Sequence, residues 1–205
     1  MRTLVIETTT EACSVALFDG DRLSLLDHRH EILGRGHAER LVPMIAELPD
    51  KGRAGAIRVS LGPGSFTGLR IGLAAARALG IAWRAEVLGY PTLSLVAARS
   101  WQPAMRPVTV CMNGGHGEWF VQNFDASLMP QDSVRSLTPD QAQAAAQHPV
   151  IAGNRAHELA ALLGKDTLAL DLMPDAEYFP LLNSRHLTGT LTPLYGRAPD
   201  AKLPK

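Results

Sequence analysis

The chain has 205 residues, of which 46% are hydrophobic and 20% charged, a composition typical of a globular protein with a sizeable core. Twenty basic and twenty acidic residues give no net charge, which argues against a broad electrostatic attraction to nucleic acid or to a membrane surface. No apolar run is long enough for a membrane span or a signal sequence, and Cys13 and Cys111 lie in apolar, strand-like segments. We therefore expect a cytoplasmic protein whose two cysteines are reduced and buried.

The first hundred residues alternate strand and helix patterns. Leu4–Ile6 is typical of a short buried strand, and the apolar segments on either side of Asp19-Gly20 predict a hairpin with a type I′ turn. A helix is expected over about residues 36–48, where Pro43 should cost one hydrogen bond and bend the helix. A strand over Ile57–Leu61 and helices over about 67–84 and 91–100 complete this half.

The second half has weaker patterns of the same kind. Strands are expected over 108–112 and 118–124 around a Gly-rich turn, followed by a helix over 138–147, a strand over 150–153, a helix over 156–163 and a loop from Thr188. Trp101-Gln102-Pro103 marks a boundary between a lobe over 1–102 and a smaller one over 103–205. This element order resembles the ribonuclease-H-like lobe of the actin, Hsp70 and sugar-kinase superfamily. We therefore expect an α/β fold of two such lobes, the second reduced.

The most distinctive segment is the turn and helix start over residues 60–72, SLGPGSFTGLRIG. Ser65 or Thr67 is expected to cap the helix, and N–H groups at such a helix start favour anions. The general phosphate motifs do not fit. No Lys lies between Lys51 and Lys165 to complete a P-loop, and the glycine spacing misses the dinucleotide fingerprint by one residue.

Three segments in order resemble the TsaB (YeaZ) family: 6–17, 37–45 and 62–72. The segment 193–199 resembles the Pro-x-Tyr-x-Arg motif that closes members of this family. The resemblance implies a non-catalytic scaffold subunit, without catalytic residues or a required cofactor, that binds and activates a TsaD-like catalytic subunit. TsaD transfers a threonylcarbamoyl group to the adenosine beside the anticodon in tRNAs that read codons beginning with A. The implied partners are TsaD, a TsaE-like ATPase and, when the chain is alone, a second copy, with tRNA bound only through the complex and no membrane.

Two departures from the family pattern concern possible shared sites. The first loop is Glu7-Thr8-Thr9-Thr10 where the family usually has Asp-Thr-Ser-Thr, and Asn113–Glu118 replaces the usual Asp-Ala-Arg. Glu7, Thr8, Thr9 and Thr10 could bind ATP or ADP weakly, with the carboxylate orienting a hydrated Mg²⁺. Alternatively, the loop is a strand end whose hydroxyls bond to local backbone.

The candidate metal ligands do not form a clear set. At the positions where the resemblance places the His pair of the catalytic relatives, this chain has Thr92 and Val96, so we expect no metal there. His28 and His30 lie two apart on a strand pattern, but nothing near them in the sequence supplies a third ligand, and we expect surface histidines.

The two helices of the first lobe carry the expected partner surface. The resemblance favours an interface in which two helices from each subunit form a four-helix bundle, and packing within the lobe is the alternative. The interface residues are a helix stripe of His37, Leu41, Ile45 and Leu48 and a small-residue face of Gly68, Gly72 and Ala75.

Two other functions remain open for a protein of this fold: a metallopeptidase and an ATP-dependent small-molecule kinase.

Overall fold

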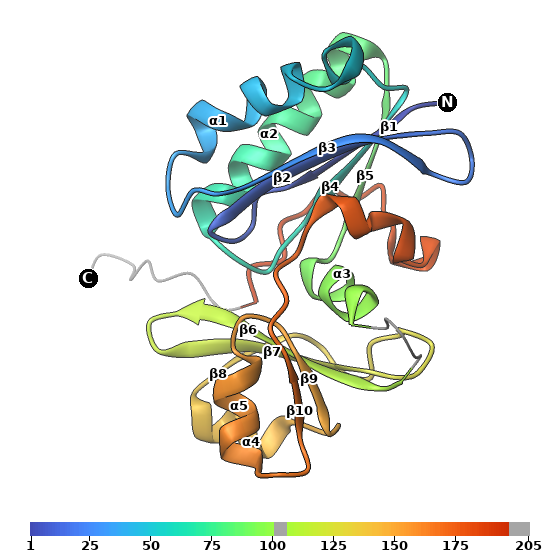
Figure 1. Cartoon of the computed structure of the whole chain (residues 1–205). Helices are drawn as coiled ribbons and strands as arrows, with labels where there is room; N and C mark the ends of the chain where they lie inside the picture. Colours follow the sequence, from blue (N-terminus) through green and yellow to red (C-terminus); the bar gives the residue numbers. More distant parts are fainter. Residues whose placement is uncertain (101–105, 197–205) are drawn as a thin grey trace.

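The computed structural model describes residues 1–100 and 106–196, and it consists of two α/β lobes (Figure 1). The predicted boundary at residues 101–103 lies outside the described residues. The sheet of the first lobe has the strand order β3-β2-β1-β4-β5, in which β1 pairs antiparallel with β2 and parallel with β4. Its strands are β1 (Thr3–Glu7), β2 (Ala12–Asp19), β3 (Ser24–Ile32), β4 (Ala56–Ser60) and β5 (Glu86–Tyr90).

The second sheet repeats this arrangement with shorter strands. Its order is β10-β9-β6-β7-β8, and again the first strand of the lobe pairs antiparallel with the second and parallel with the fourth. The predicted pair of related α/β lobes is thus confirmed in the topology, although no repeat is visible in the sequence. The strands are β6 (Val108–Gly115), β7 (Glu118–Phe124), β8 (Arg135–Leu137), β9 (Val150–Ala152) and β10 (Leu168–Leu170).

Helices cover the outer face of each sheet, as Figure 1 shows. In the first lobe α1 (His37–Ala46) and α2 (Phe66–Trp83) bury one apolar stripe each against the sheet, and in the second lobe α4 (Pro139–Ala145) and α5 (Ala156–Leu163) do the same. Because side chains alternate along a strand, each sheet has a second apolar face, and these faces are turned toward each other.

The space between the two sheets is filled by α3 (Thr92–Arg99) and by two 3₁₀ segments, η2 (Ala176–Leu181) and η3 (Ser184–His186). α3 packs against β6 and η2, and η2 packs against β1, β2 and β3. After β10, therefore, the chain returns from the second lobe to the first. The segment that follows reaches the turn after β4, where the Leu194 N–H donates to the Leu61 carbonyl at 2.7 Å.

The first hairpin differs from its sequence-based prediction. Asp19 pairs with Ser24, so the loop comprises the four residues 20–23 and the strands bulge between Leu17 and Phe18. Gly20 and Leu23 have positive φ angles of 69° and 50°. The predicted two-residue type I′ turn at Asp19-Gly20 is therefore wrong, because the bulge changes the register and moves the turn forward along the chain.

Most other element predictions hold, with errors at the ends and in the shortest strands. α1 ends at Ala46 with Pro43 inside it, and buried Leu48 follows in a bend before the 3₁₀ segment η1 (Pro49–Gly52). Ser65 caps α2 by accepting a hydrogen bond from the Gly68 N–H at 3.3 Å. The sequence patterns missed β5, β8 and β10.

Both cysteines are buried and free, as predicted, and burial is the main cause that raises the pKa of each thiol to about 12. No helix within residues 1–100 or 106–196 combines the length and the apolar character that crossing a membrane requires.

The small residues of α2 let the helix approach the loop after β1. A Cβ atom placed on Gly68 would lie 2.0 Å from the Thr8 carbonyl oxygen, and one on Gly72 would lie 2.4 Å from Thr8 Oγ1. The Thr8 hydroxyl in turn donates to the Gly68 carbonyl at 2.7 Å. These glycines therefore serve packing within the lobe.

We predict that Gly72→Ala destabilises the isolated chain, since the new methyl group displaces the Thr8 hydroxyl from its partner. The cost of overpacking, about 1–3 kcal/mol, is partly offset by the higher helix propensity of alanine, worth roughly 1 kcal/mol. Urea unfolding measures the net loss.

A double-mutant cycle with Thr8→Ala is the control. In the Thr8→Ala background the clashing oxygen is gone, so Gly72→Ala should cost less than in the wild type. Equal costs in both backgrounds would show that the Thr8 contact is not what excludes a side chain at position 72.

Candidate functional site

The loop after β1 is closed by its own hydrogen bonds. The hydroxyls of Thr8 and Thr9 bond to Gly68 and Glu7, and the Thr10 hydroxyl accepts from the Ala12 N–H at 3.2 Å. Glu7, Thr8 and Thr9 are almost completely buried. The geometry thus matches the alternative in which the hydroxyls bond to neighbouring groups of the chain.

The turn after β4 covers this loop. The Ser65 N–H donates to the Thr9 carbonyl at 2.6 Å, and a Cβ atom on Gly64 would lie 2.1 Å from the same oxygen. Gly64 and Gly68 hold the turn in direct contact with the backbone of Thr8 and Thr9. A phosphate group between the turn and the loop would have to displace this contact.

Glu7 is the centre of a buried polar network at the carboxyl end of β1. Its Oε1 accepts hydrogen bonds from the backbone N–H and the hydroxyl of Thr9 at 2.9 and 2.5 Å, and the Tyr90 hydroxyl lies 3.4 Å from Oε2. Thr92 continues the network, with its hydroxyl 3.0 Å from that of Thr9 and 2.5 Å from that of Ser60.

Burial dominates the electrostatics of this network. Desolvation raises the pKa of Glu7 above its usual value, and the hydrogen bonds from Thr9, Ser60 and Tyr90 only partly oppose it. Burial also raises the pKa of Tyr90, with the nearby charge of Glu7 as the next cause. The network joins β1, β4 and α3, and it can hold these elements in place without contacting solvent.

Most of the residues expected at the partner surface are also in the core. Their burial corrects the prediction that these side chains contact a partner directly, because packing against the sheet already uses this side of α1 and α2. His37, for example, lies with its Nε2 3.2 Å from the Ala12 carbonyl oxygen. The buried residues are His37, Leu41, Ile45, Leu48, Gly68 and Gly72, while Ala75 is partly buried.

The opposite side of the same two helices is exposed and carries aligned small and apolar residues beside the charged Glu39, Arg70 and Arg77; we call the small and apolar residues the outer face. The exposed positions recur at intervals of three or four residues, so they align along each helix. Val42 is 59% exposed and Ile81 is 83% exposed, which leaves two large apolar side chains in solvent amid small ones. The outer face consists of Ala38, Val42 and Ala46 on α1 and Ala74, Ala78 and Ile81 on α2.

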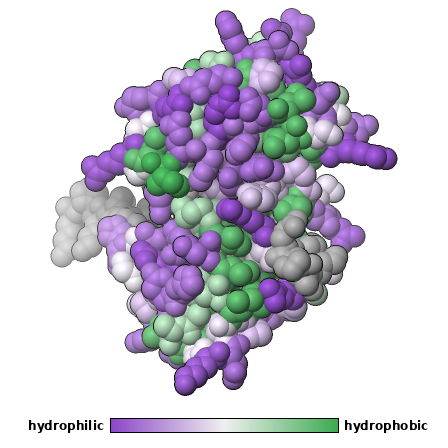
Figure 2. Space-filling model, viewed as in Figure 1, coloured by the Kyte–Doolittle hydropathy of each residue, from purple (hydrophilic) through white to green (hydrophobic). Residues whose placement is uncertain are grey.

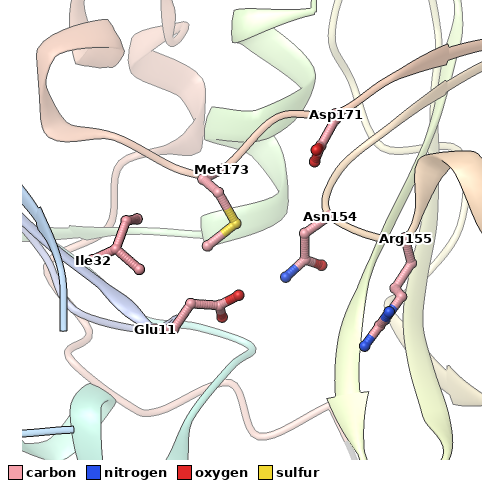
Figure 3. A pocket seen from close by; sticks show the side chains of 6 residues that line it. All are labelled: Glu11, Ile32, Asn154, Arg155, Asp171 and Met173. Carbon is pink, nitrogen blue, oxygen red and sulfur yellow. The ribbon is translucent and has the colours of Figure 1, made fainter. Parts of the chain in front are cut away.

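A cavity of about 320 Å³ lies between the lobes (Figure 3). Glu11 and Ile32 approach it from the first lobe, Asn154 and Arg155 from the start of α5, and Asp171 and Met173 from the segment after β10. Arg155 forms an ion pair with Glu158. The two other carboxylates therefore give the cavity an acidic lining, which disfavours a polyphosphate.

Sequence reasoning missed two parts of this arrangement. Tyr90 and Thr92 belong to the Glu7 network, but they lie more than eighty residues from Glu7 in the sequence and carry no local signal. The outer face had a signal, the alanines and Val42 spaced four apart on α1. The other side of the same helix is more hydrophobic, so the sequence pattern favours that side as the contact surface.

Comparisons with known proteins identify relatives along most of the chain. The family model described as TsaD, tRNA N6-adenosine threonylcarbamoyltransferase, matches residues 30–161. The tRNA threonylcarbamoyladenosine biosynthesis protein TsaB of Escherichia coli is 36% identical over 107 residues, 50% of this chain and 45% of that protein. An uncharacterized protein of Mycobacterium tuberculosis is 30% identical over 206 residues, 97% of this chain and 93% of its own.

The alignments with the TsaB proteins cover only about half of each chain. The TsaB of Haemophilus influenzae is 38% identical over 100 residues, 46% of this chain and 40% of that protein. The chain thus spans less than half the length of these two curated relatives.

Solved structures give the same picture for the whole fold. YeaZ from Pseudomonas aeruginosa superposes with a TM-score of 0.77 at 26% identity, covering 95% of this chain and 99% of that one. The ethanolamine utilization protein EutJ of Carboxydothermus hydrogenoformans, 9% identical with a TM-score of 0.52 over 89% of this chain and 90% of that one, shares the fold alone. The predicted class, two ribonuclease-H-like lobes, is confirmed.

Titration of Glu7 gives a prediction for stability. Its pKa is higher in the folded chain than in the unfolded chain, so the folded state binds more protons between the two values. The free energy of unfolding should therefore fall as the pH rises from about 4.5 through the raised pKa. Glu7→Gln, which does not titrate, should gain stability relative to the wild type over this range.

Urea unfolding at a series of pH values measures the slope, and Glu39→Gln, which removes an exposed carboxylate on α1, is the control. Parallel profiles for the wild type and Glu7→Gln would contradict the assigned shift.

Proposed function

Because the chain belongs to the TsaB (YeaZ) family of TsaD-related proteins, we propose that it is a non-catalytic subunit in the biosynthesis of threonylcarbamoyladenosine on tRNA. In this role it binds and activates a TsaD-like catalytic subunit, which modifies the adenosine beside the anticodon of tRNAs that read codons beginning with A. No cofactor of its own is required, and ATP or ADP binds weakly at most.

The outer face of α1 and α2 is the observation that carries the proposal. Two adjacent helices expose aligned small residues, which allow another helix pair to approach closely, and Val42 and Ile81 supply large apolar side chains for burial. Figure 2 shows one side of the molecule, on which hydrophilic residues predominate and hydrophobic residues gather in a few patches. A helix pair from the partner would complete a four-helix bundle on the outer face.

The same surface suits a second copy of the chain. A TsaD-like subunit and a second copy would then compete for the outer face, so the chain alone would form a homodimer and exchange it for the heterodimer. A TsaE-like ATPase would bind the assembled pair. With no net charge on the chain, tRNA would be held mainly by the other subunits.

Three positions support a non-catalytic role over the alternatives. Thr92 and Val96, which stand where the resemblance places the His pair of the catalytic relatives, are 1% and 0% exposed. Gly153 follows β9, as the glycine turn follows β4 in the first lobe, and packs onto β6, where a Cβ atom on it would lie 2.2 Å from the Cys111 carbonyl oxygen. These contacts favour neither a metallopeptidase nor a kinase.

Depletion of the protein tests the role in tRNA modification. We expect threonylcarbamoyladenosine in bulk tRNA, quantified by mass spectrometry of nucleosides, to fall on depletion and to return when the wild-type gene is restored. Unchanged levels would contradict the proposal.

Substitutions on the outer face test the partner surface. Val42→Glu and Ile81→Glu should each abolish or strongly weaken co-purification with the TsaD-like protein of the same organism, because a buried unpaired carboxylate opposes association. The isolated variants should keep their stability within about 0.5 kcal/mol, as exposed sites usually do.

Leu162→Glu is the matched control, because Leu162 is an exposed leucine, 39% accessible, on the outer helix α5 of the second lobe. It should bind like the wild type. Full binding by both α1 and α2 variants would place the partner elsewhere.

A further inference from the structure

Three potential metal ligands from distant parts of the sequence meet beneath the first sheet. His28 lies on β3, while Asp175 and Glu177 lie where the chain enters η2 after returning from the second lobe. One ligand atom from each residue lies within 4.8 Å of those of the other two. The shortest such distance, 3.5 Å, joins His28 Nε2 and Glu177 Oε2.

The start of η2 and the carboxylate of Asp175 are held in place by hydrogen bonds of the chain. The Ala176 N–H donates to the Ser14 hydroxyl on β2 at 2.9 Å, which anchors the start of η2 on the sheet. Asp175 Oδ1 accepts from the Glu177 N–H at 3.2 Å, so the side chain of Asp175 is oriented by its own segment. An ion would therefore bind to an anchored segment, and only the side chains of His28 and Glu177 would have to move.

The two carboxylates of the site are not balanced by a nearby Lys or Arg among the described residues. Asp175 is only 6% exposed, and a buried carboxylate is costly unless a cation or several donors compensate it. Among residues 1–100 and 106–196, neither Asp175 nor Glu177 forms an ion pair with Lys or Arg. The nearby Arg99 instead donates to the Met173 carbonyl and stacks on Tyr178, with its Cζ atom 4.3 Å from the ring centroid.

We propose that the chain binds one divalent transition-metal ion through His28, Asp175 and Glu177. One imidazole and two carboxylates suit Zn²⁺ or Mn²⁺, whereas Mg²⁺ and Ca²⁺ prefer oxygen ligands alone. Donor atoms around a tetrahedral zinc ion lie about 3.3–3.6 Å apart. His28 and Glu177 already meet this spacing, and a rotation of their half-exposed side chains closes the remaining gap to Asp175.

The ion would tie the segment that returns from the second lobe to the sheet of the first lobe. It joins β3, which lies at the edge of the first sheet, to the segment that follows β10 of the second sheet. Because the ion binds only the folded arrangement, it should stabilise the chain in proportion to the logarithm of its concentration. The site is separate from the outer face, so metal binding should persist whether or not the proposed partner binds.

Titration of the metal-stripped full chain with ZnCl₂, and separately with MnCl₂, tests the proposal by calorimetry. We expect one ion per chain, with affinity reduced roughly tenfold or more in His28→Ala and in Glu177→Gln. Both changes are at half-exposed side chains, so the variants should fold. Zn²⁺ or Mn²⁺ should also raise the melting temperature of the wild type and have little effect on His28→Ala.

His30→Ala is the matched control, since His30 lies on the same face of the same strand two residues further on and is exposed. It should retain the wild-type affinity. The proposal is overturned if the wild type binds neither ion at micromolar concentration, or if His28→Ala and Glu177→Gln bind as tightly as the wild type. In that case His28 and Glu177 form an ordinary ion pair.

Discussion

The close approach of α2 to the loop after β1 is the contact on which the first lobe depends. Without side chains at Gly64, Gly68 and Gly72, the turn and the helix touch the backbone and hydroxyls of Thr8 and Thr9 directly. This contact buries Glu7, uses the loop hydroxyls internally and sets the position of α2 on the sheet. It therefore decides which side of α2 reaches solvent, and with it where the outer face lies.

The second lobe uses the same device on a smaller scale. Gly153 follows β9 as the glycine turn follows β4, and it packs onto the backbone of β6 as that turn packs onto the end of β1. The two lobes thus share a topology and a packing contact at equivalent places. In both lobes a glycine thus lets a turn touch the backbone of the first strand or of the loop that follows it.

The interior between the lobes is unusually acidic for a core. Glu7 and Asp175 both act on Tyr90, whose pKa burial and these two charges raise. Hydroxyl and backbone donors to Glu7 partly offset the burial that raises the pKa of its carboxyl group. Asp175 has fewer such donors and lies beside Glu177 and His28, an arrangement that a cation would complete. The proposed metal and the proposed partner act on opposite faces of the first sheet.

The sequence by itself determined the α/β class, the two-lobe organisation and the family, and it placed the cap of α2 at Ser65 or Thr67, because these follow from hydrophobic periodicity and from motifs that are local in the chain. Its apolar stripe on α1 was identified correctly but assigned to a partner, since periodicity marks a buried side without saying what buries it. Only the tertiary structure decided that the sheet covers His37 and Leu41, that Tyr90 and Thr92 join Glu7, and that Asp175 and Glu177 meet His28. Those contacts join residues separated by tens to more than a hundred positions, and their geometry depends on how the sheets are packed rather than on any nearby residue pattern.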